Sequence, residues 1–269
     1  MANKSDKAAQ YIPIIAHIFE KHWKSGTASF EFDRDEMIEA AKTLGVDRPL
    51  NLGDLIYSFK FRKELPNSII ATAPEGKSWL LESAGRSRYR FRLVAKGGAT
   101  IKPRQDLAAI KIPDATPEII GAYALGDEQA LLAKVRYNRL VDIFLGLTTY
   151  SLQNHLRTQV AGMGQIEIDE IYVGINKNGA QYVIPVQAKG GSDKLSPVQT
   201  TQDIACCEAK FPDLICRPVC AQFMEKNVIA LFELTVEGGE VLVAEERHYR
   251  LVPSDQIDAA AKRHYANRS

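Results

Sequence analysis

Apolar residues recur at helical spacing in the N-terminal part of the chain. At 7–23 they fall three or four positions apart, which predicts an amphipathic helix. A short alternating stretch at 28–32 predicts a strand, and two more helical patterns follow, capped by Asp33 or Asp35 and by Asn51. The stretches 69–73, 78–82 and 87–94 then look like strands. The first third of the chain is therefore predicted to be a small helical unit with a sheet.

This order of helix, short strand, two helices and a two- or three-stranded sheet is that of a winged helix-turn-helix domain, which we expect at 1–96. Apolar residues and arginines alternate in its last strand, and 85–96 holds four arginines and a lysine without an acid. The third helix also ends in basic residues. These features favour DNA as a partner, while pairing with acids and a solvated polar face are the alternatives. The expected DNA contacts are Lys60, Arg62, Arg86, Arg88 and Arg90.

The rest of the chain predicts a second domain. The segment 97–120 contains prolines and paired glycines with little periodicity, which predicts a linker. We expect helices at 127–145 and 149–160, a hairpin at 166–191 and a helix at 196–210. Strands at 215–223, 228–237, 240–244 and 249–252 and a helix at 255–264 complete the domain, 121–269. The predicted fold class is α/β (α+β), with a mixed sheet flanked by helices.

Composition narrows the class of protein but not its partner. The chain of 269 residues is 45% hydrophobic and 25% charged with a net charge of +1, as in ordinary soluble globular proteins. It has no N-terminal apolar signal and no apolar run long enough to span a bilayer, so we expect a cytoplasmic protein without a membrane partner. The four cysteines are expected to be free thiols, with a zinc site that includes His248 as a weaker alternative.

The hairpin at 166–191 carries the candidate chemistry. Its first strand contains Glu167, Asp169 and Glu170, an Asn-Gly pair predicts the turn, and its second strand ends in Gln187-Ala188-Lys189. Magnesium prefers oxygen ligands and is often held by one or two carboxylates together with substrate phosphates. Asp169 is the expected anchoring ligand, with the Gln187 side-chain carbonyl and the Ala188 main-chain carbonyl as further ligands. Lys189 would orient a water or stabilise developing charge. The alternative is a surface hairpin with ordinary polar ends.

Asp169 followed by Gln187-Ala188-Lys189 at the end of an apolar strand resembles the PD-(D/E)XK nuclease superfamily, in particular type II restriction endonucleases. The resemblance covers about residues 125–225, with a looser likeness of 7–95 to the winged-helix domains that some restriction enzymes carry. It implies that Asp169, Gln187 and Lys189 are catalytic, that the helix at 196–210 belongs to the nuclease core, and that the cofactor is Mg²⁺, with Mn²⁺ as a substitute. It also implies double-stranded DNA as substrate, a homodimer, no nucleotide cofactor and a prokaryotic cell.

Gln187 departs from the motif because it stands where the superfamily has an acid. The candidates for a compensating acid are Glu167, Glu170 and the upstream Glu128 and Asp142. Strand alternation places Glu167 with Asp169 and Glu170 on the opposite face, but the apolar positions change parity, which suggests a bulge near Asp169. A two-residue turn would set Glu170 opposite Gln187, and a three-residue loop would set Asp169 there. We expect Asp169 as the metal ligand, with Glu167 second.

The leading hypothesis is a magnesium-dependent, sequence-specific endonuclease that hydrolyses phosphodiester bonds of double-stranded DNA. Gln199, on the helix after the hairpin, is a further expected DNA contact. One alternative is a DNA-binding regulator whose nuclease-like domain is inactive because of Gln187. Another is a structure-specific repair or recombination nuclease of the same superfamily.

Overall fold

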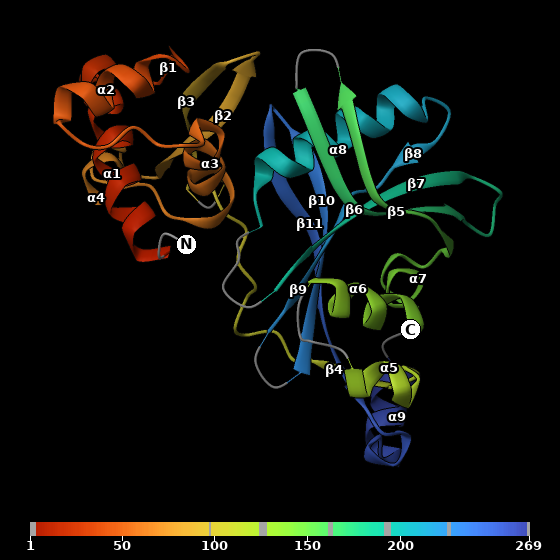
Figure 1. Cartoon of the computed structure of the whole chain (residues 1–269). Coiled ribbons are helices and arrows are strands. Elements are labelled where there is room, and N and C mark those ends of the chain that lie inside the picture. The colour runs from red at the N-terminus through yellow and green to blue at the C-terminus, as the bar shows by residue number, and fades with distance from the viewer. Residues whose placement is uncertain are drawn as a thin grey trace.

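The chain forms two units, each with its own sheet (Figure 1). The structure is a computed structural model, and it describes residues 4–96, 98–123, 128–160, 164–190, 195–224 and 227–267. A three-stranded sheet belongs to the N-terminal unit, and an eight-stranded sheet belongs to the second. The protein is thus a mixed α and β protein whose larger sheet is flanked by helices, as the sequence predicts.

The N-terminal unit follows the predicted element order. It consists of α1 (Lys4–His22), β1 (Ser29–Asp33), α2 (Glu36–Leu44), α3 (Leu52–Tyr57) with a π-helical continuation (Ser58–Arg62), α4 (Asn67–Ile70), β2 (Lys77–Gly85) and β3 (Arg88–Ala95). The sheet order is β1-β3-β2, and both pairings are antiparallel. The strand expected at 69–73 is wrong, since α4 begins there after Pro66. A short apolar run does not distinguish a strand from a helical turn, and only Ile69 of its isoleucine pair is buried.

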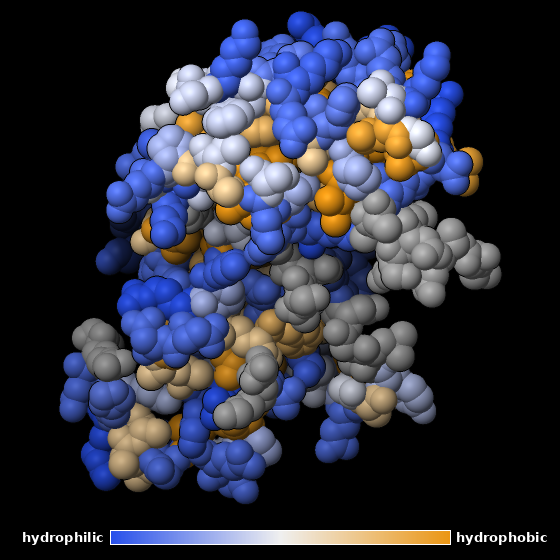
Figure 2. Space-filling model, turned by 90° about the vertical axis from the view of Figure 1, so that its left-hand side faces the viewer, coloured by the Kyte–Doolittle hydropathy of each residue, from blue (hydrophilic) through white to orange (hydrophobic). Residues whose placement is uncertain are grey.

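Aromatic side chains build the core of this unit. Phe19 of α1 lies 5.1 Å from Trp79 of β2 and 5.2 Å from Phe91 of β3, measured between ring centroids, and both contacts are edge-to-face. Such contacts stabilise a core beyond the area that they bury. The outer surface of this side of the molecule is largely hydrophilic, with smaller hydrophobic groups between (Figure 2).

The second unit is built on a sheet with strand order β4-β11-β10-β9-β7-β6-β5, and β8 also pairs with β7. Its strands are β4 (Ile110–Pro113), β5 (Thr148–Val160), β6 (Gly164–Ile175), β7 (Gln181–Lys189), β8 (Ile215–Cys216), β9 (Val219–Phe223), β10 (Val228–Glu237) and β11 (Glu240–Val252). Its helices are α5 (Glu118–Tyr123), α6 (Glu128–Tyr137), α7 (Leu140–Leu145), α8 (Pro197–Lys210) and α9 (Ala259–Ala266), with a 3₁₀ turn at Ser254–Gln256.

Helices cover both faces of the central strands. Apolar residues of α6 and α7 pack with Tyr172, Ile184 and Val186 on one face. On the other face, α8 contributes Cys206 and Cys207 to a cluster with Ile168, Ile171 and Val183. The four cysteines are free thiols, and three of them are buried. The central hairpin is therefore fixed between two layers of helices, which makes it a rigid support for polar groups at its end.

Several predictions for this unit need correction. The strands expected separately at 240–244 and 249–252 are one continuous strand, β11. The helix expected at 149–160 is the edge strand β5, since the segment pairs with β6 along its length. The prediction failed because Leu152, Leu156 and Val160 have a four-residue spacing that imitates a helix. The helix expected at 127–145 divides into α6 and α7 at Arg139, whose φ is 48°. The expected linker, 97–120, contributes β4, which pairs in parallel with β11.

The hairpin of β6 and β7 is confirmed, and its loop decides the register. Residues 176–180 join the strands, and Glu170 lies opposite Val186, which places Asp169 across from Gln187. The sheet has a register shift on β5 between Ser151 and Gln153, which pair with Tyr172 and Ile171. Beside Asp169, where the irregularity is expected, His155 has a φ of 49° and Ile168 and Ile171 belong to one apolar cluster, so strict alternation is interrupted there as well.

Candidate functional site

The candidate site lies where β6 and β7 separate. Their pairing ends at Glu170 and Val186, and β7 continues beside β9 to Lys189. The backbone N–H of Ala188 donates a 2.9 Å hydrogen bond to Asp169 Oδ2. Because the N–H and C=O of one strand residue point to the same edge, the Ala188 carbonyl also faces the Asp169 side. The structure thus brings Asp169 and the main chain of Ala188 together as the sequence predicts.

Lys189 enters the same site from the end of β7. Its Nζ lies 3.1 Å from Glu128 Oε1, so the first residue of α6 joins the site. Burial alone would lower the pKa of Lys189, but the Asp169 and Glu128 carboxylates outweigh that effect and raise its pKa. A cation at this position is therefore held in its charged form. Of the two upstream acids considered, Glu128 belongs to the site.

Gln187 lies on a buried polar chain that leads into α8. Its Nε2 donates to Asp203 Oδ2 at 2.9 Å and to the Glu167 main-chain oxygen at 3.2 Å. Its Oε1 accepts from Gln199 Nε2 at 2.6 Å. Gln199 and Asp203 are four residues apart on α8, so both side chains lie on the helix face that meets the hairpin. Gln187 is thus held by the carboxyl group of Asp203, on α8.

The two aspartates of the site are both desolvated. Asp169 is 8% exposed and Asp203 is 1% exposed. Burial raises the pKa of Asp169, although Lys189 and the Ala188 N–H oppose the increase. Burial raises the pKa of Asp203 well above its ordinary value, with Gln187 opposing it and Asp169 adding to it. Oδ1 of Asp203 has no hydrogen-bond partner in the part of the chain that the structure describes. Such buried carboxyl groups are costly, and they are typical of functional sites.

The other candidate acids have different partners. Glu170 is fully buried on the opposite face, where it accepts from Arg136 Nε at 2.8 Å and from Ser151 Oγ at 2.6 Å. Asp142 accepts from the main chain and hydroxyl of Thr149. Glu167 faces Arg157 at 3.1 Å and is partly exposed. Sequence reasoning missed Asp203; its spacing from Gln199 on the predicted helix was the available signal.

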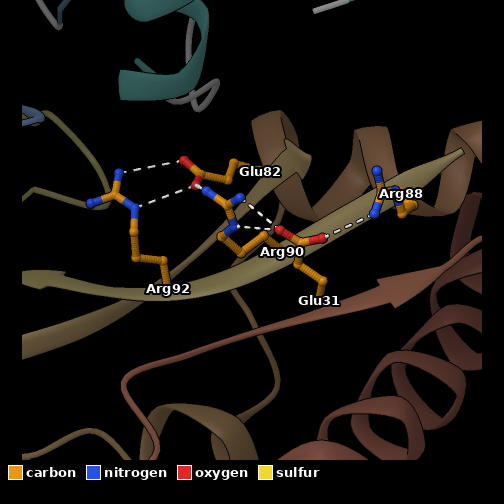
Figure 3. A network of polar contacts seen from close by, with 5 residues as sticks. All are labelled: Glu31, Glu82, Arg88, Arg90 and Arg92. Atoms are coloured by element: carbon orange, nitrogen blue, oxygen red, sulfur yellow. Dashed lines mark hydrogen bonds and ion pairs between the residues drawn. The ribbon is translucent and has the colours of Figure 1, made fainter. Parts of the chain in front are cut away.

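Acidic side chains from neighbouring strands pair with the arginines of β3 (Figure 3). Arg90 stands opposite Glu31 of β1 and Glu82 of β2, and the N–O distances are 2.6 and 3.5 Å. Arg88 approaches Glu31 at 3.7 Å, and Arg92 approaches Glu82 at 3.3 Å. Glu31 is 59 residues from Arg90, and Glu82 stands on the preceding strand, outside the stretch 85–96, so that stretch taken alone is purely basic. These three arginines therefore form ion pairs with acids, which is one of the alternatives that the sequence leaves open for this strand.

The other expected DNA contacts differ in exposure. Lys60 donates to Ser83 Oγ at 3.1 Å, and burial lowers its pKa to about 8. Arg62 is exposed and lies over the Tyr57 ring, 4.9 Å from its centroid. Arg86 is exposed at the turn between β2 and β3.

Tyr57, at the end of α3, also contributes to the raised pKa of Lys189, after Asp169 and Glu128. Phe61, in the π-helical continuation of α3, packs with Leu80 and Val94 and with Val198 of α8, so this end of the helix lies beside the candidate site.

The donor set suits a hard divalent cation. The Asp169 carboxylate and the Ala188 carbonyl offer oxygen at the fork, and Asp203 offers a carboxylate that contacts Gln187. Within the described residues no group of three or more His, Cys, Asp or Glu side chains is placed to hold a metal, so neither the zinc alternative nor a preformed carboxylate cage is present there.

No family model matches the chain, and neither a curated protein nor a solved structure matches it. In the described part of the chain, no helix is long and apolar enough to cross a membrane.

Proposed function

We propose that the protein is a magnesium-dependent endonuclease that hydrolyses phosphodiester bonds of double-stranded DNA. The observation that supports this most directly is the convergence of Asp169, the Ala188 main chain and Lys189 where β6 and β7 separate. A buried carboxylate beside a buried, charged lysine is costly for stability alone. It is suited to binding a cation and a phosphate at adjacent positions.

Each residue has a chemical role in this proposal. Asp169 would anchor Mg²⁺, and the Ala188 carbonyl and the oxygen of Gln187 would be further ligands or spacers. When bound, Mg²⁺ would lower the pKa of a water molecule and stabilise the leaving oxygen. Lys189 holds the attacking water or stabilises the charge that develops on the phosphate. Glu128 keeps the ammonium group of Lys189 in position.

Asp203 is the proposed substitute for the acid that Gln187 lacks. Its Oδ2 accepts a hydrogen bond from the Gln187 side chain, and its buried Oδ1 has no hydrogen-bond partner among the described residues. Glu167, the second candidate from the sequence, is partly exposed and pairs with Arg157 instead. The negative charge of the site would therefore come from α8 rather than from β7.

The N-terminal unit is proposed to be a winged helix-turn-helix domain that contacts the same DNA. Its element order and its β1-β3-β2 sheet support this assignment. The end of α3 lies near Lys189, so Arg62 and the active site would meet one duplex. We further propose a homodimer, since a palindromic target matches a two-fold axis.

Incubation of the purified protein with plasmid DNA in Mg²⁺ or EDTA tests the proposal. We expect discrete, Mg²⁺-dependent fragments from the wild type and none from Asp169→Asn or Lys189→Ala. Lys177→Ala, at the exposed turn of the same hairpin, is the matched control and should cut like the wild type. Binding of duplex DNA without cleavage by the wild type would contradict the enzyme and support the regulator. Cleavage restricted to branched junctions would support the repair nuclease.

A further inference from the structure

Strands β5 and β6 extend beyond β7 as a two-stranded ribbon. Residues 164–169 of β6 pair with β5 alone within the described part of the sheet, from Val160 opposite Gly164 to Leu156 opposite Ile168. In Figure 1 the two strands rise together alongside α8. The ribbon starts at the candidate active site, because Asp169 is at its base.

The two faces of the ribbon are chemically different. Ile166 and Ile168 are buried against Cys206 and Cys207 of α8, and Leu156 packs on the same cluster. This contact fixes the ribbon on the body of the protein. The opposite face carries polar side chains, with Gln159 paired to Gln165 and Arg157 paired to Glu167 across the strands. His155, whose Nδ1 lies 3.5 Å from Glu167 Oε1, continues this face toward Asp169.

The polar face is open to solvent. Gln159 and Gln165 are exposed, and the side chains of Arg157 and His155 are 65% and 50% exposed. Arg157 lies 3.1 Å from Glu167, and His155 contacts Gln129 at 2.9 Å at the base of the ribbon. A continuous row of hydrogen-bonding groups therefore runs from the ribbon to Asp169.

We infer that this face of the ribbon reads base edges in the major groove of duplex DNA, with Arg157, Gln159 and Gln165 as specificity-determining residues. The inference rests on the proposed function and extends it to sequence recognition. A two-stranded β-ribbon fits the major groove, where glutamine pairs with adenine and arginine with guanine.

The charges of the face favour base edges over the phosphate backbone. Arg157 is accompanied by the carboxylates of Glu167 and Asp169, so the face has no excess of positive charge. A surface that follows phosphates needs such an excess. Amides, a guanidinium and a carboxylate are instead the groups that discriminate bases, the carboxylate by accepting from the cytosine amino group.

The length of the ribbon sets where the recognised bases lie. From Asp169 to Gln165 the strand advances roughly 13 Å, at about 3.3 Å per residue. That distance corresponds to about four base-pair steps of about 3.4 Å each. The base pairs read by the two glutamines are therefore expected within about five base pairs of the phosphodiester that is cut.

The test is selection of bound sequences from a randomised duplex library with EDTA present, so that no cleavage occurs. The variants are Gln159→Ala with Gln165→Ala, and separately Arg157→Gln. The matched control is Gln181→Ala, an exposed glutamine at the other end of the hairpin. Unchanged thermal unfolding midpoints will establish that all variants are folded.

The wild type and the control should select one motif, and the double variant should lose preference at one or two of its positions. Its affinity for the motif should fall about tenfold or more, while its affinity for unrelated DNA stays the same. Selection of an unaltered motif with unaltered affinity by both ribbon variants would overturn the inference and leave the proposed nuclease intact. If the wild type binds duplex DNA without sequence preference, the inference about the ribbon is overturned and the proposed nuclease is not. A wild type that binds no duplex DNA would overturn both.

Discussion

Gln187 Nε2 donates a 2.9 Å hydrogen bond to Oδ2 of Asp203, so the neutral motif residue on β7 is coupled to a carboxyl group on α8. The substitution Asp203→Asn keeps the size and an acceptor oxygen but removes the charge. We expect Mg²⁺-dependent cleavage to fall about 10- to 100-fold, as when a supporting residue of a metal site is lost. The measurement is the single-turnover rate, with the exposed Glu208→Gln on the same helix as control. An unchanged rate would assign the compensating charge elsewhere.

A second prediction concerns moving the negative charge from position 203 to position 187. Gln187→Glu alone sets two carboxyl groups in hydrogen-bond contact, so one of them stays protonated and the site gains no charge. We expect this variant to cut no faster than the wild type at neutral pH. Gln187→Glu combined with Asp203→Asn should recover most of the activity lost in Asp203→Asn alone. Cleavage rates of the three proteins at equal Mg²⁺ concentration decide this, and a failure of the double variant to recover would argue against a shared role.

The raised pKa of Asp203 predicts how stability depends on pH. Its cause is burial, so the folded state binds the proton more tightly than the unfolded state does. The stabilisation that Asp203 adds to the free energy of unfolding is fully present below the ordinary aspartate pKa of about 3.9. It is lost as the pH rises through the higher pKa of the folded state. The free energy of unfolding of the wild type should therefore fall relative to that of Asp203→Leu as the pH increases. Urea titrations from about pH 5 to about pH 8 measure this difference.

The same reasoning predicts that Asp203→Leu is more stable and inactive. The leucine removes a buried carboxyl group with an unpartnered oxygen, whose burial costs about 1–3 kcal/mol. A gain in the urea midpoint at pH 8 together with loss of cleavage would mark Asp203 as a residue kept for function at the expense of stability. Loss of stability in this variant would instead give Asp203 a structural role.

Ion pairing divides the basic residues of the N-terminal unit into two groups. Arg62 and Arg86 are exposed, whereas Arg90 is held by Glu31 and Glu82. We expect Arg62→Ala and Arg86→Ala each to weaken DNA binding and to reduce the slope of log Kd against log salt concentration by about 0.9. Arg90→Ala should change the slope less and the stability by about 1 kcal/mol or less, since partly exposed ion pairs contribute little. Equal slopes in all three variants would contradict this division.

Local pattern determined much of the fold. Helices α1, α2 and α3, the hairpin of β6 and β7, and α8 with Ser196 before it are where their spacing and turn residues predict. The same pattern failed at β5, where a four-residue apolar spacing imitated a helix and only pairing with β6 decided for a strand. It failed again at 69–73, where an apolar pair too short to distinguish two conformations became α4.

The sequence by itself determined the reactive residues of the hairpin, because Asp169, Gln187 and Lys189 stand at the ends of strands that the chain encodes locally. Only the tertiary structure decided their partners. Asp203 joins Gln187, Glu128 joins Lys189, and Glu31 and Glu82 pair with the arginines of β3. These relationships depend on strand register and on the packing of helices against the sheet. Both are set by contacts between residues far apart in the chain, and the spacing of residues along one segment carries no information about them.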